Sequence, residues 1–284
     1  MHKEMPASDW AGDRGKKWVE HMAATEVMLS PIDAPLIEAL NLQDGCLVAD
    51  IGCGGGRTTR AIAQRLDSES QVAGIDVSPD VIAAAKSSRA EQSDADTVGA
   101  KIEFHCVDAA SGRPALAPFD RLGSRFGVMF FEDPPAAFAN LRSWLNPGGQ
   151  FAFAVWGPLP QNAWIACLRQ VIANLVELPK PPPDAPGPFR YADADRFCQL
   201  LETAGFSNLS VAPWQGELAL GGGMDAKTAA AFCLSAFSVG DLVGDDPALL
   251  HRAEADLAEC LVEYEQGGVV RMPSAVNIVS GRRA

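Results

Sequence analysis

The chain has 284 residues, of which 48% are hydrophobic and 21% charged, and its formal net charge is −13 at pH 7. This length suits one large domain or a core with a smaller appendage, and the acidity disfavours nucleic acids and anionic membranes as partners. The seven cysteines include no C-x-x-C pair, and the four histidines show no metal-ligand spacing, so we expect neither a disulfide framework nor a metal site. We find no signal-like or membrane-spanning apolar run, and we therefore expect a cytoplasmic protein.

The first half of the sequence predicts helices followed by a parallel sheet. Residues 1–42 include the helical pattern KKWVEHMAATEVMLSPIDAPLIEAL. From residue 46 to about 156, short apolar runs alternate with helical patterns, which is typical of βα units. The expected strands are 46–52, 71–77, 101–108, 119–127 and 150–156, and the expected helices are 57–66, 79–90 and 136–145. Ser78 and Pro79 supply an N-cap and a first-turn proline for the second of these helices.

The character of the sequence changes after residue 157. LPKPPPDAPGPF, at 178–189, predicts an extended proline-rich connector, with a partner-binding motif as the alternative. The expected elements beyond it are a helix at 193–206, a strand starting at 208, helical stretches at 225–240 and 247–266, and a strand at 274–282. We therefore divide the chain into a helical cap (1–42), a core (43–157), a proline-rich lid connector (158–192), a core helix and strand (193–215), a helical lid insertion (216–270) and a final core strand (271–284).

The stretch VADIGCGGGR, at 48–57, is a glycine-rich loop directly after the first expected strand. A nucleoside-triphosphate loop needs G-x-x-x-x-G-K-[ST], and no lysine follows these glycines. A dinucleotide fingerprint needs G-x-G-x-x-G, but Arg57 or Thr59 stands where the third glycine belongs. The spacing that fits is acid-x-G-x-G-x-G from Asp50 to Gly56. A negative residue there is unsuited to a pyrophosphate, and it suits a ligand with an ammonium and a sulfonium group.

This motif resembles the first-strand motif of the class I S-adenosylmethionine-dependent methyltransferases. Further matches to that family are Asp76 at the end of the second expected strand, CVDAA after the third, SRFGVMFFEDP after the fourth and LNPGGQFAFAVWG around the fifth. The N-terminal part of the chain resembles a bacterial subgroup of small-molecule methyltransferases, related to the ubiquinone/menaquinone C-methyltransferases. The stretches that carry this likeness are DWAGDRGKKWVEHM and LIEALNLQDG. The likeness is specific through about residue 157 and weak across 158–270.

The resemblance implies an α/β fold with a doubly wound, mostly parallel, seven-stranded Rossmann-like sheet, N-terminal helices and a helical lid insertion after strand 5. It implies S-adenosyl-L-methionine as cofactor, with Asp76 accepting hydrogen bonds from the ribose hydroxyls and Asp108 binding the adenine amino group. The candidate cofactor-binding residues are Asp50, Gly52, Cys53, Gly54, Gly56, Asp76, Val77, Asp108, Ala109, Ser124, Arg125, Phe126 and Trp18. His21 is a candidate general base because it lies on the segment expected to close over the cofactor.

The expected reaction is an in-line methyl transfer to a small, apolar or aromatic acceptor. Segments 158–190 and 215–266 are the expected lid, and several aromatic residues either line the acceptor pocket or belong to the core: Trp156, Trp164, Phe189, Tyr191, Trp214, Phe232 and Phe237. Arg125 is an alternative contact for an anionic substrate group. Two other functions stay open: a nicotinamide-dependent oxidoreductase, and a methyltransferase-fold binding protein without catalysis. A homodimer also stays open.

Overall fold

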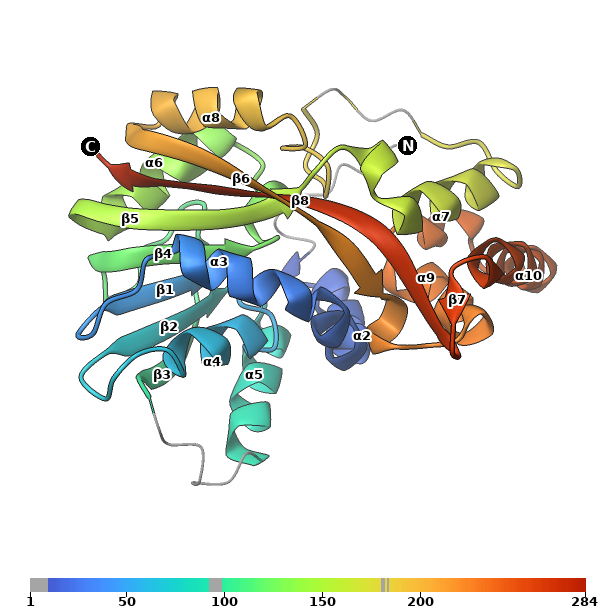
Figure 1. Ribbon diagram of the computed structural model, residues 1–284, viewed down its shortest axis with the longest axis horizontal. Helices are drawn as coiled ribbons and strands as arrows, with labels where there is room; N and C mark the ends of the chain where they lie inside the picture. Colours follow the sequence, from blue (N-terminus) through green and yellow to red (C-terminus); the bar gives the residue numbers. More distant parts are fainter. Residues whose placement is uncertain (1–9, 92–98, 180–181, 183) are drawn as a thin grey trace.

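The computed structural model describes residues 10–91, 99–179, 182 and 184–284. Within them the central sheet has the order β3-β2-β1-β4-β5-β8-β6, and β7 pairs with β8 (Figure 1). The first five strands in that order are parallel, whereas β8 is antiparallel to both neighbours. The strands are β1 (Leu47–Ile51), β2 (Gln71–Asp76), β3 (Lys101–Cys106), β4 (Phe119–Arg125), β5 (Leu145–Trp156), β6 (Phe206–Ala219), β7 (Glu265–Gln266) and β8 (Val269–Arg283). The predicted doubly wound, mostly parallel sheet is confirmed, with the short β7 as an addition.

The helices begin where local capping residues place them. The α-helices are α2 (Asp13–Leu29), α3 (Asp33–Ala39), α4 (Arg57–Ala63), α5 (Pro79–Glu91), α6 (Pro134–Trp144), α7 (Ala163–Ala173), α8 (Ala194–Thr203), α9 (Ala226–Ala236) and α10 (Pro247–Val262). The short 3₁₀ helices are η1 (Ser30–Ile32), η3 (Val128–Phe130), η4 (Leu159–Gln161), η5 (Leu220–Gly222) and η6 (Gly240–Val243). The side chains of Asp133, Asp193, Asp225 and Asp246 accept first-turn N–H groups of α6, α8, α9 and α10, as expected of N-caps.

Helices cover both faces of the sheet (Figure 1). On the face of α3 and α4, a Cβ added at Gly123 of β4 would lie 3.3 Å from Leu40 Cδ1 and 3.8 Å from Ile62 Cδ1. On the opposite face, Phe138 of α6 packs against Phe153 of β5, with ring centroids 6.0 Å apart. Strands covered on both sides need apolar residues at consecutive positions. This explains why apolar and polar residues do not alternate regularly in the segment 47–51.

The cap helix α2 lies at the end of the sheet where β1 and β4 finish, between the core and the lid (Figure 1). It packs against α5 on the core side, and against η5 and α9 on the other. The chain then turns through η1 into α3, which packs on β4, β5 and β8. In the part of the chain that the structure describes, no helix combines the length and the apolar character that a membrane span requires.

Helices α7, α9 and α10 lie in the segments expected to form a lid, and we call them the lid helices. They gather around the curving ends of β6 and β8 (Figure 1). Helix α7 occupies part of residues 158–192, where we expected only a connector, because its buried face is apolar throughout: Trp164, Ile165, Leu168, Val171 and Ile172. Strand β6 continues to Ala219, past the expected limit at residue 215, and β8 starts at Val269, two residues before the expected limit at residue 271. The helix expected at 225–240 is divided into α9 and η6, and the one expected at 247–266 ends at Val262.

Part of the proline-rich segment is described as well. Residues 180, 181 and 183 of the expected connector at 178–189 lie outside the described residues, and residues 178, 179 and 182 belong to no helix or strand.

Candidate functional site

The glycine-rich loop lies at the point where the sheet order reverses. Strand β1 pairs with β2 on one side and with β4 on the other, and the loop joins β1 to α4. Open α/β sheets bind ligands outside the carboxyl ends of their strands at such a switch point. The ends of β2, β3 and β4 therefore contribute the neighbouring residues of the candidate site.

The loop glycines are required by the local backbone. Gly52, Gly54 and Gly56 have φ angles of +66°, +55° and +82°, a region that side chains with a Cβ rarely adopt. A Cβ at Gly52 would lie 2.7 Å from Gly127 Cα, and a Cβ at Gly56 would lie 2.5 Å from Phe104 Cζ. The alternate spacing of the motif thus follows from alternate left-handed residues in a tightly packed turn.

Asp50 lies beneath the loop. Its side chain is buried, at 1% exposure, and Oδ2 accepts a hydrogen bond of 2.6 Å from Thr59 Oγ1 of α4. Burial raises its pKa to about 7, against the lowering effect of the Thr59 hydroxyl and the Arg125 charge. The carboxyl group therefore ties the end of β1 to the first turn of α4.

Asp76, at the end of β2, contacts the loop directly. Its Oδ2 accepts the Gly54 N–H at 3.2 Å, and its Oδ1 accepts the Ser78 N–H at 3.0 Å. Burial raises the pKa of Asp76, although these backbone donors lower it. Val77 follows Asp76, and its carbonyl accepts a 3.4 Å contact from Cys106 Sγ of β3.

Asp108 and Ala109 follow β3, beside the end of β2. Asp108 shapes its own turn, because Oδ1 accepts the Ala110 N–H at 2.9 Å and Oδ2 accepts the Ser111 hydroxyl at 2.6 Å. The Ala109 carbonyl accepts the side-chain amide of Asn140, a residue of α6, at 3.0 Å. The strand pairing of β2 with β3 places this turn next to Asp76 and Val77.

Ser124 and Arg125, at the end of β4, make internal contacts. Ser124 Oγ donates to the Ile51 carbonyl at 2.8 Å and accepts the Gly127 N–H at 3.2 Å. Arg125 Nη1 lies 3.1 Å from Asp33 Oδ1, and both side chains are nearly buried. These two residues hold the end of β4 to β1 and to the cap.

Phe126 starts a row of aromatic rings that reaches the lid. It has a φ of +65° and stacks on Trp156 with ring centroids 4.3 Å apart. Further edge or tilted contacts connect Trp156 to Trp164, Trp164 to Phe237, Phe237 to Phe232, and Phe232 to His21. Of the other expected pocket residues, Phe189 lies 6.3 Å from Trp156, whereas Tyr191 stacks on Phe197 of α8 and Trp214 covers Gly216 within β6.

The cap helix places three side chains against the outer side of the glycine loop. A Cβ at Gly54 would lie 3.4 Å from Trp18 Nε1, and a Cβ at Gly55 would lie 2.5 Å from Met22 Sδ and 2.8 Å from Glu26 Oε1. These three residues of α2 are spaced by four and therefore share one helix face. His21 lies on a different face, edge-on to Phe232 of α9 at 5.9 Å.

The structure thus brings Trp18 together with the predicted loop residues and places His21 toward the lid. Sequence reasoning missed Met22, Glu26 and Asp33. A signal was available in the sequence: Glu26 is spaced eight residues, or two steps of four, from Trp18 and therefore lies on the same helix face. An acid on a buried helix face needs a partner. Cys53 is buried inside the loop, and desolvation raises its thiol pKa well above 9.

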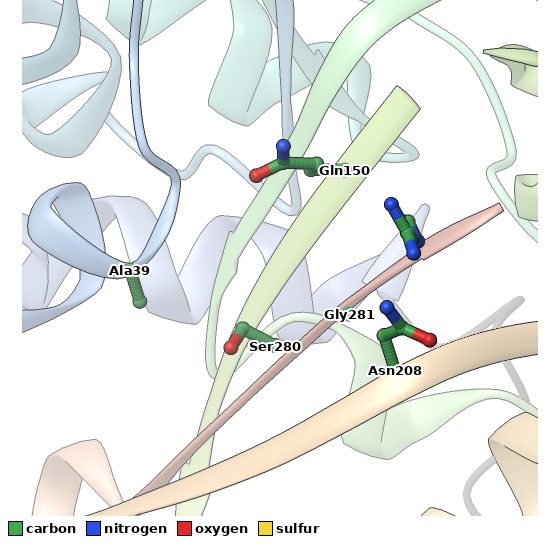
Figure 2. Close-up of a pocket in the computed structure, with 6 residues that line it drawn as sticks. Ala39, Gln150, Asn208, Ser280 and Gly281 are labelled. Atoms are coloured by element: carbon green, nitrogen blue, oxygen red, sulfur yellow. The ribbon is translucent and has the colours of Figure 1, made fainter. Parts of the chain in front are cut away.

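One hollow of about 210 Å³ lies away from this site, lined by Ala39, Gln150, Asn208, Ser280, Gly281 and Arg282. Figure 2 shows the side chains of Gln150, Ser280 and Asn208 around it. Gln150 pairs with Arg121, near the start of β4, so the hollow belongs to the edge opposite the glycine loop. Among the described residues, no group of three or more His, Cys, Asp or Glu side chains is arranged to hold a metal ion.

Comparison with known proteins identifies the central segment. Residues 48–149 match the family model of a methyltransferase domain. Phosphoethanolamine N-methyltransferase 1 of Arabidopsis thaliana is 32% identical over 173 residues, which are 61% of this chain and 31% of that protein. Trans-aconitate 2-methyltransferase of Streptomyces avermitilis is 33% identical over 118 residues, which are 40% of each chain. This chain therefore spans less than half of the length of either relative.

A solved structure matches over most of the chain. It is phosphoethanolamine N-methyltransferase 2 of Haemonchus contortus in complex with phosphomonomethylethanolamine and S-adenosylhomocysteine. The TM-score is 0.51 at 15% identity, with 89% of this chain and 52% of that chain covered. Residues 48–149 are therefore similar to a methyltransferase domain, and the chain has a Rossmann-like α/β fold similar to that of this solved methyltransferase.

Proposed function

We propose that this protein is an S-adenosylmethionine-dependent methyltransferase that acts on a small molecule. The observation that supports it best is the placement of the glycine loop between two acids, Asp76 at the end of β2 and Glu26 on α2. Glu26 Oε1 is buried and has no hydrogen-bond partner. Acids on both sides of a close backbone approach fit a nucleoside that has an ammonium and a sulfonium group. They do not suit a pyrophosphate.

We assign the cofactor-binding roles along the carboxyl edge of the sheet. Asp76 would accept the ribose hydroxyls and Asp108 the adenine amino group, with the backbone of Val77 and Ala109 beside them. The loop from Gly52 to Gly56, including Cys53, would lie along the cofactor, and Trp18 would cover it. Asp50, Ser124 and Arg125 would support this surface from below through the contacts described above.

The cofactor supplies an activated methyl group on sulfur, which leaves a neutral thioether. The protein then has to orient the acceptor and exclude water, and correct positioning is worth about 7–11 kcal/mol in well-oriented reactions. Phe126, at the end of β4, would face the transferring group, and α2 with the lid helices would exclude water. His21 is the candidate base for an acceptor that must lose a proton.

The row of rings from Phe126 to Phe232 supports an apolar or aromatic acceptor. Apolar walls with few polar groups are typical of small-molecule pockets. The two curated relatives are named for phosphoethanolamine and trans-aconitate, which differ in charge, so they do not define the acceptor of this chain. The cap sequence supports membership of the bacterial subgroup related to the ubiquinone/menaquinone C-methyltransferases.

Calorimetric titration tests the proposal without knowledge of the acceptor. We expect S-adenosylhomocysteine to bind and NAD⁺ not to bind; the reverse result would favour an oxidoreductase. Asp76→Asn should weaken S-adenosylhomocysteine binding by a few kcal/mol, since charge-assisted hydrogen bonds to the ribose are weakened. Glu202→Gln, an exposed acid on α8, is the control and should bind as the wild type does. Release of S-adenosylhomocysteine in a screen of phenols, quinones and amines then reports turnover and separates an enzyme from a silent binding protein.

A further inference from the structure

Glu26 on α2 has an unsatisfied carboxylate oxygen at the glycine loop. The residue is buried, at 9% exposure, and its Oε1 has no hydrogen-bond partner. This oxygen lies 2.8 Å and 3.6 Å from the positions that a Cβ would take at Gly55 and Gly54. Leaving a buried charged acceptor without a partner is costly, so the placement calls for a donor that binds at this surface.

The backbone N–H groups of Arg57 and Gly55 lower the pKa of the Glu26 carboxyl group, but no side-chain cation is paired with it among the described residues. The charges of Arg125 and Arg60 both lower the pKa of Glu26. Arg125 is already paired with Asp33, and Arg60 forms no ion pair with Glu26 within 4.0 Å. Desolvation nevertheless dominates and raises the pKa of Glu26. A cationic ligand group would offset that desolvation.

The order of groups along the loop indicates which end of a ligand meets Glu26. Gly54 donates its N–H to Asp76 on the β2 side, where the nucleoside is expected. Gly55, the next residue, faces Glu26 on the α2 side. A nucleoside joined through sulfur to an amino acid would therefore place its amino-acid end toward α2. Asp50, the acid of the motif, is not on this side of the loop, because its carboxyl group is buried beneath it against Thr59.

From this geometry we infer that Glu26 binds the ammonium group of the amino-acid part of the S-adenosyl ligand, an inference that rests on the proposed function. An ammonium has three donors and a full positive charge, which match the unpartnered buried carboxylate oxygen. The cap helix is then part of the cofactor site. It couples cofactor binding to the position of α2, which also packs on α9 of the lid.

The test is a calorimetric comparison of two variants and two ligands at one pH. Glu26→Gln keeps the size of the side chain and removes the charge, and Glu20→Gln removes an exposed acid from the same helix. The ligands are S-adenosylhomocysteine and S-adenosyl-4-thiobutyrate, which keeps the carboxylate and lacks only the amino group. Such a cycle isolates the interaction between Glu26 and the ammonium.

We expect Glu26→Gln to weaken S-adenosylhomocysteine binding by about 10- to 100-fold, the size of a charge-assisted contact. Binding of the deaminated ligand should change by less than about twofold, and Glu20→Gln should match the wild type with both ligands. Equal weakening of both ligands would assign Glu26 a structural role, and unchanged binding would assign it none; either result overturns the inference. Failure of the wild type to bind either ligand would instead overturn the proposed function. If Glu26→Gln does not fold, Glu26→Asp should show a smaller loss with the same ligand selectivity.

Discussion

Asp33, at the start of α3, forms a nearly buried ion pair with Arg125 at the end of β4, with Oδ1 and Nη1 3.1 Å apart. The same oxygen accepts a 2.8 Å hydrogen bond from Thr58 Oγ1 of α4, and Oδ2 lies 3.6 Å from Arg57 Nε. One carboxylate therefore joins the cap to the helix that follows the glycine loop and to β4. The cap residues that face the loop depend on this connection for their position.

The two arginines of this cluster should differ strongly in their effect on stability. The Arg125 side chain is 8% exposed, whereas that of Arg57 is 44% exposed. Removing one partner of a buried pair costs about 3–5 kcal/mol, and an exposed pair contributes about 0–1 kcal/mol. We expect Arg125→Met to lower the free energy of unfolding by about 3–5 kcal/mol, and Arg57→Met by less than about 1 kcal/mol. Urea unfolding measures both, and equal losses would contradict the assignment of Asp33–Arg125 as the buried connection.

The tight packing of Gly52 in the glycine loop leads to a prediction for which Gly148 serves as the control. Gly52 and Gly148 have similar φ angles, +66° and +76°. A Cβ at Gly148 would meet nothing within 4 Å, whereas one at Gly52 would lie 2.7 Å from the backbone of Gly127. Both alanine variants pay about 1–2 kcal/mol for the left-handed conformation, and Gly52→Ala should lose a further 1–3 kcal/mol, approximately, through overpacking. Equal unfolding free energies of the two variants would show that Gly127 does not constrain the loop.

The strands and the glycine motif were predictable because both depend on local patterns. Residues buried on both faces, as in β1, appear as apolar runs, and the spacing of Gly52, Gly54 and Gly56 reflects alternate positive φ angles. The extent of β8 was not predictable in the same way. It starts at Val269, five residues before the expected strand, because pairing with β6 extends it to Arg271 and pairing with β7 extends it to Val269.

The cap side of the site depended on tertiary contacts that no local pattern specifies. Glu26 reads as an ordinary helix acid until α2 is docked on the loop, and Asp33 reads as a surface residue until Arg125 reaches it. The burial of Asp50 beneath the loop could not be predicted for the same reason, since its hydrogen-bond partner Thr59 lies on the next helix. The sequence therefore identified the glycine loop. Which of the acidic residues near the loop face the candidate site was decided by the packing of other elements.

Asp50 should make stability depend on pH. Its pKa rises from 3.8 to about 7 because the carboxyl group is buried, so the native state keeps a proton that the unfolded chain loses. Its contribution is fully present below about pH 3.8 and is lost as the pH rises through about 7. Between pH 5 and pH 8, the wild type should lose roughly 3 kcal/mol more unfolding free energy than Asp50→Asn. Urea unfolding at several pH values measures this difference.

The comparison of wild type with variant is needed because other acids titrate in the same direction. Burial also raises the pKa values of Glu26 and Asp76, but both residues are present in the two proteins, and their contributions largely cancel. Asn keeps an oxygen that can accept from Thr59. Parallel stability curves for wild type and variant would show that Asp50 is ionised throughout this range and would remove the basis of the prediction.

The cysteines should differ in reactivity according to burial. The thiolate is the reactive form, and desolvation raises the pKa of the Cys53 thiol well above 9 and that of Cys233 to about 12. Cys106, in contrast, is exposed. We expect iodoacetamide at pH 8 to modify Cys106 in the native protein within minutes and to leave Cys53 and Cys233 unmodified until urea unfolds the chain. Peptide mass spectrometry over time measures the modification, and rapid native labelling of Cys53 would show that the glycine loop opens readily to solvent.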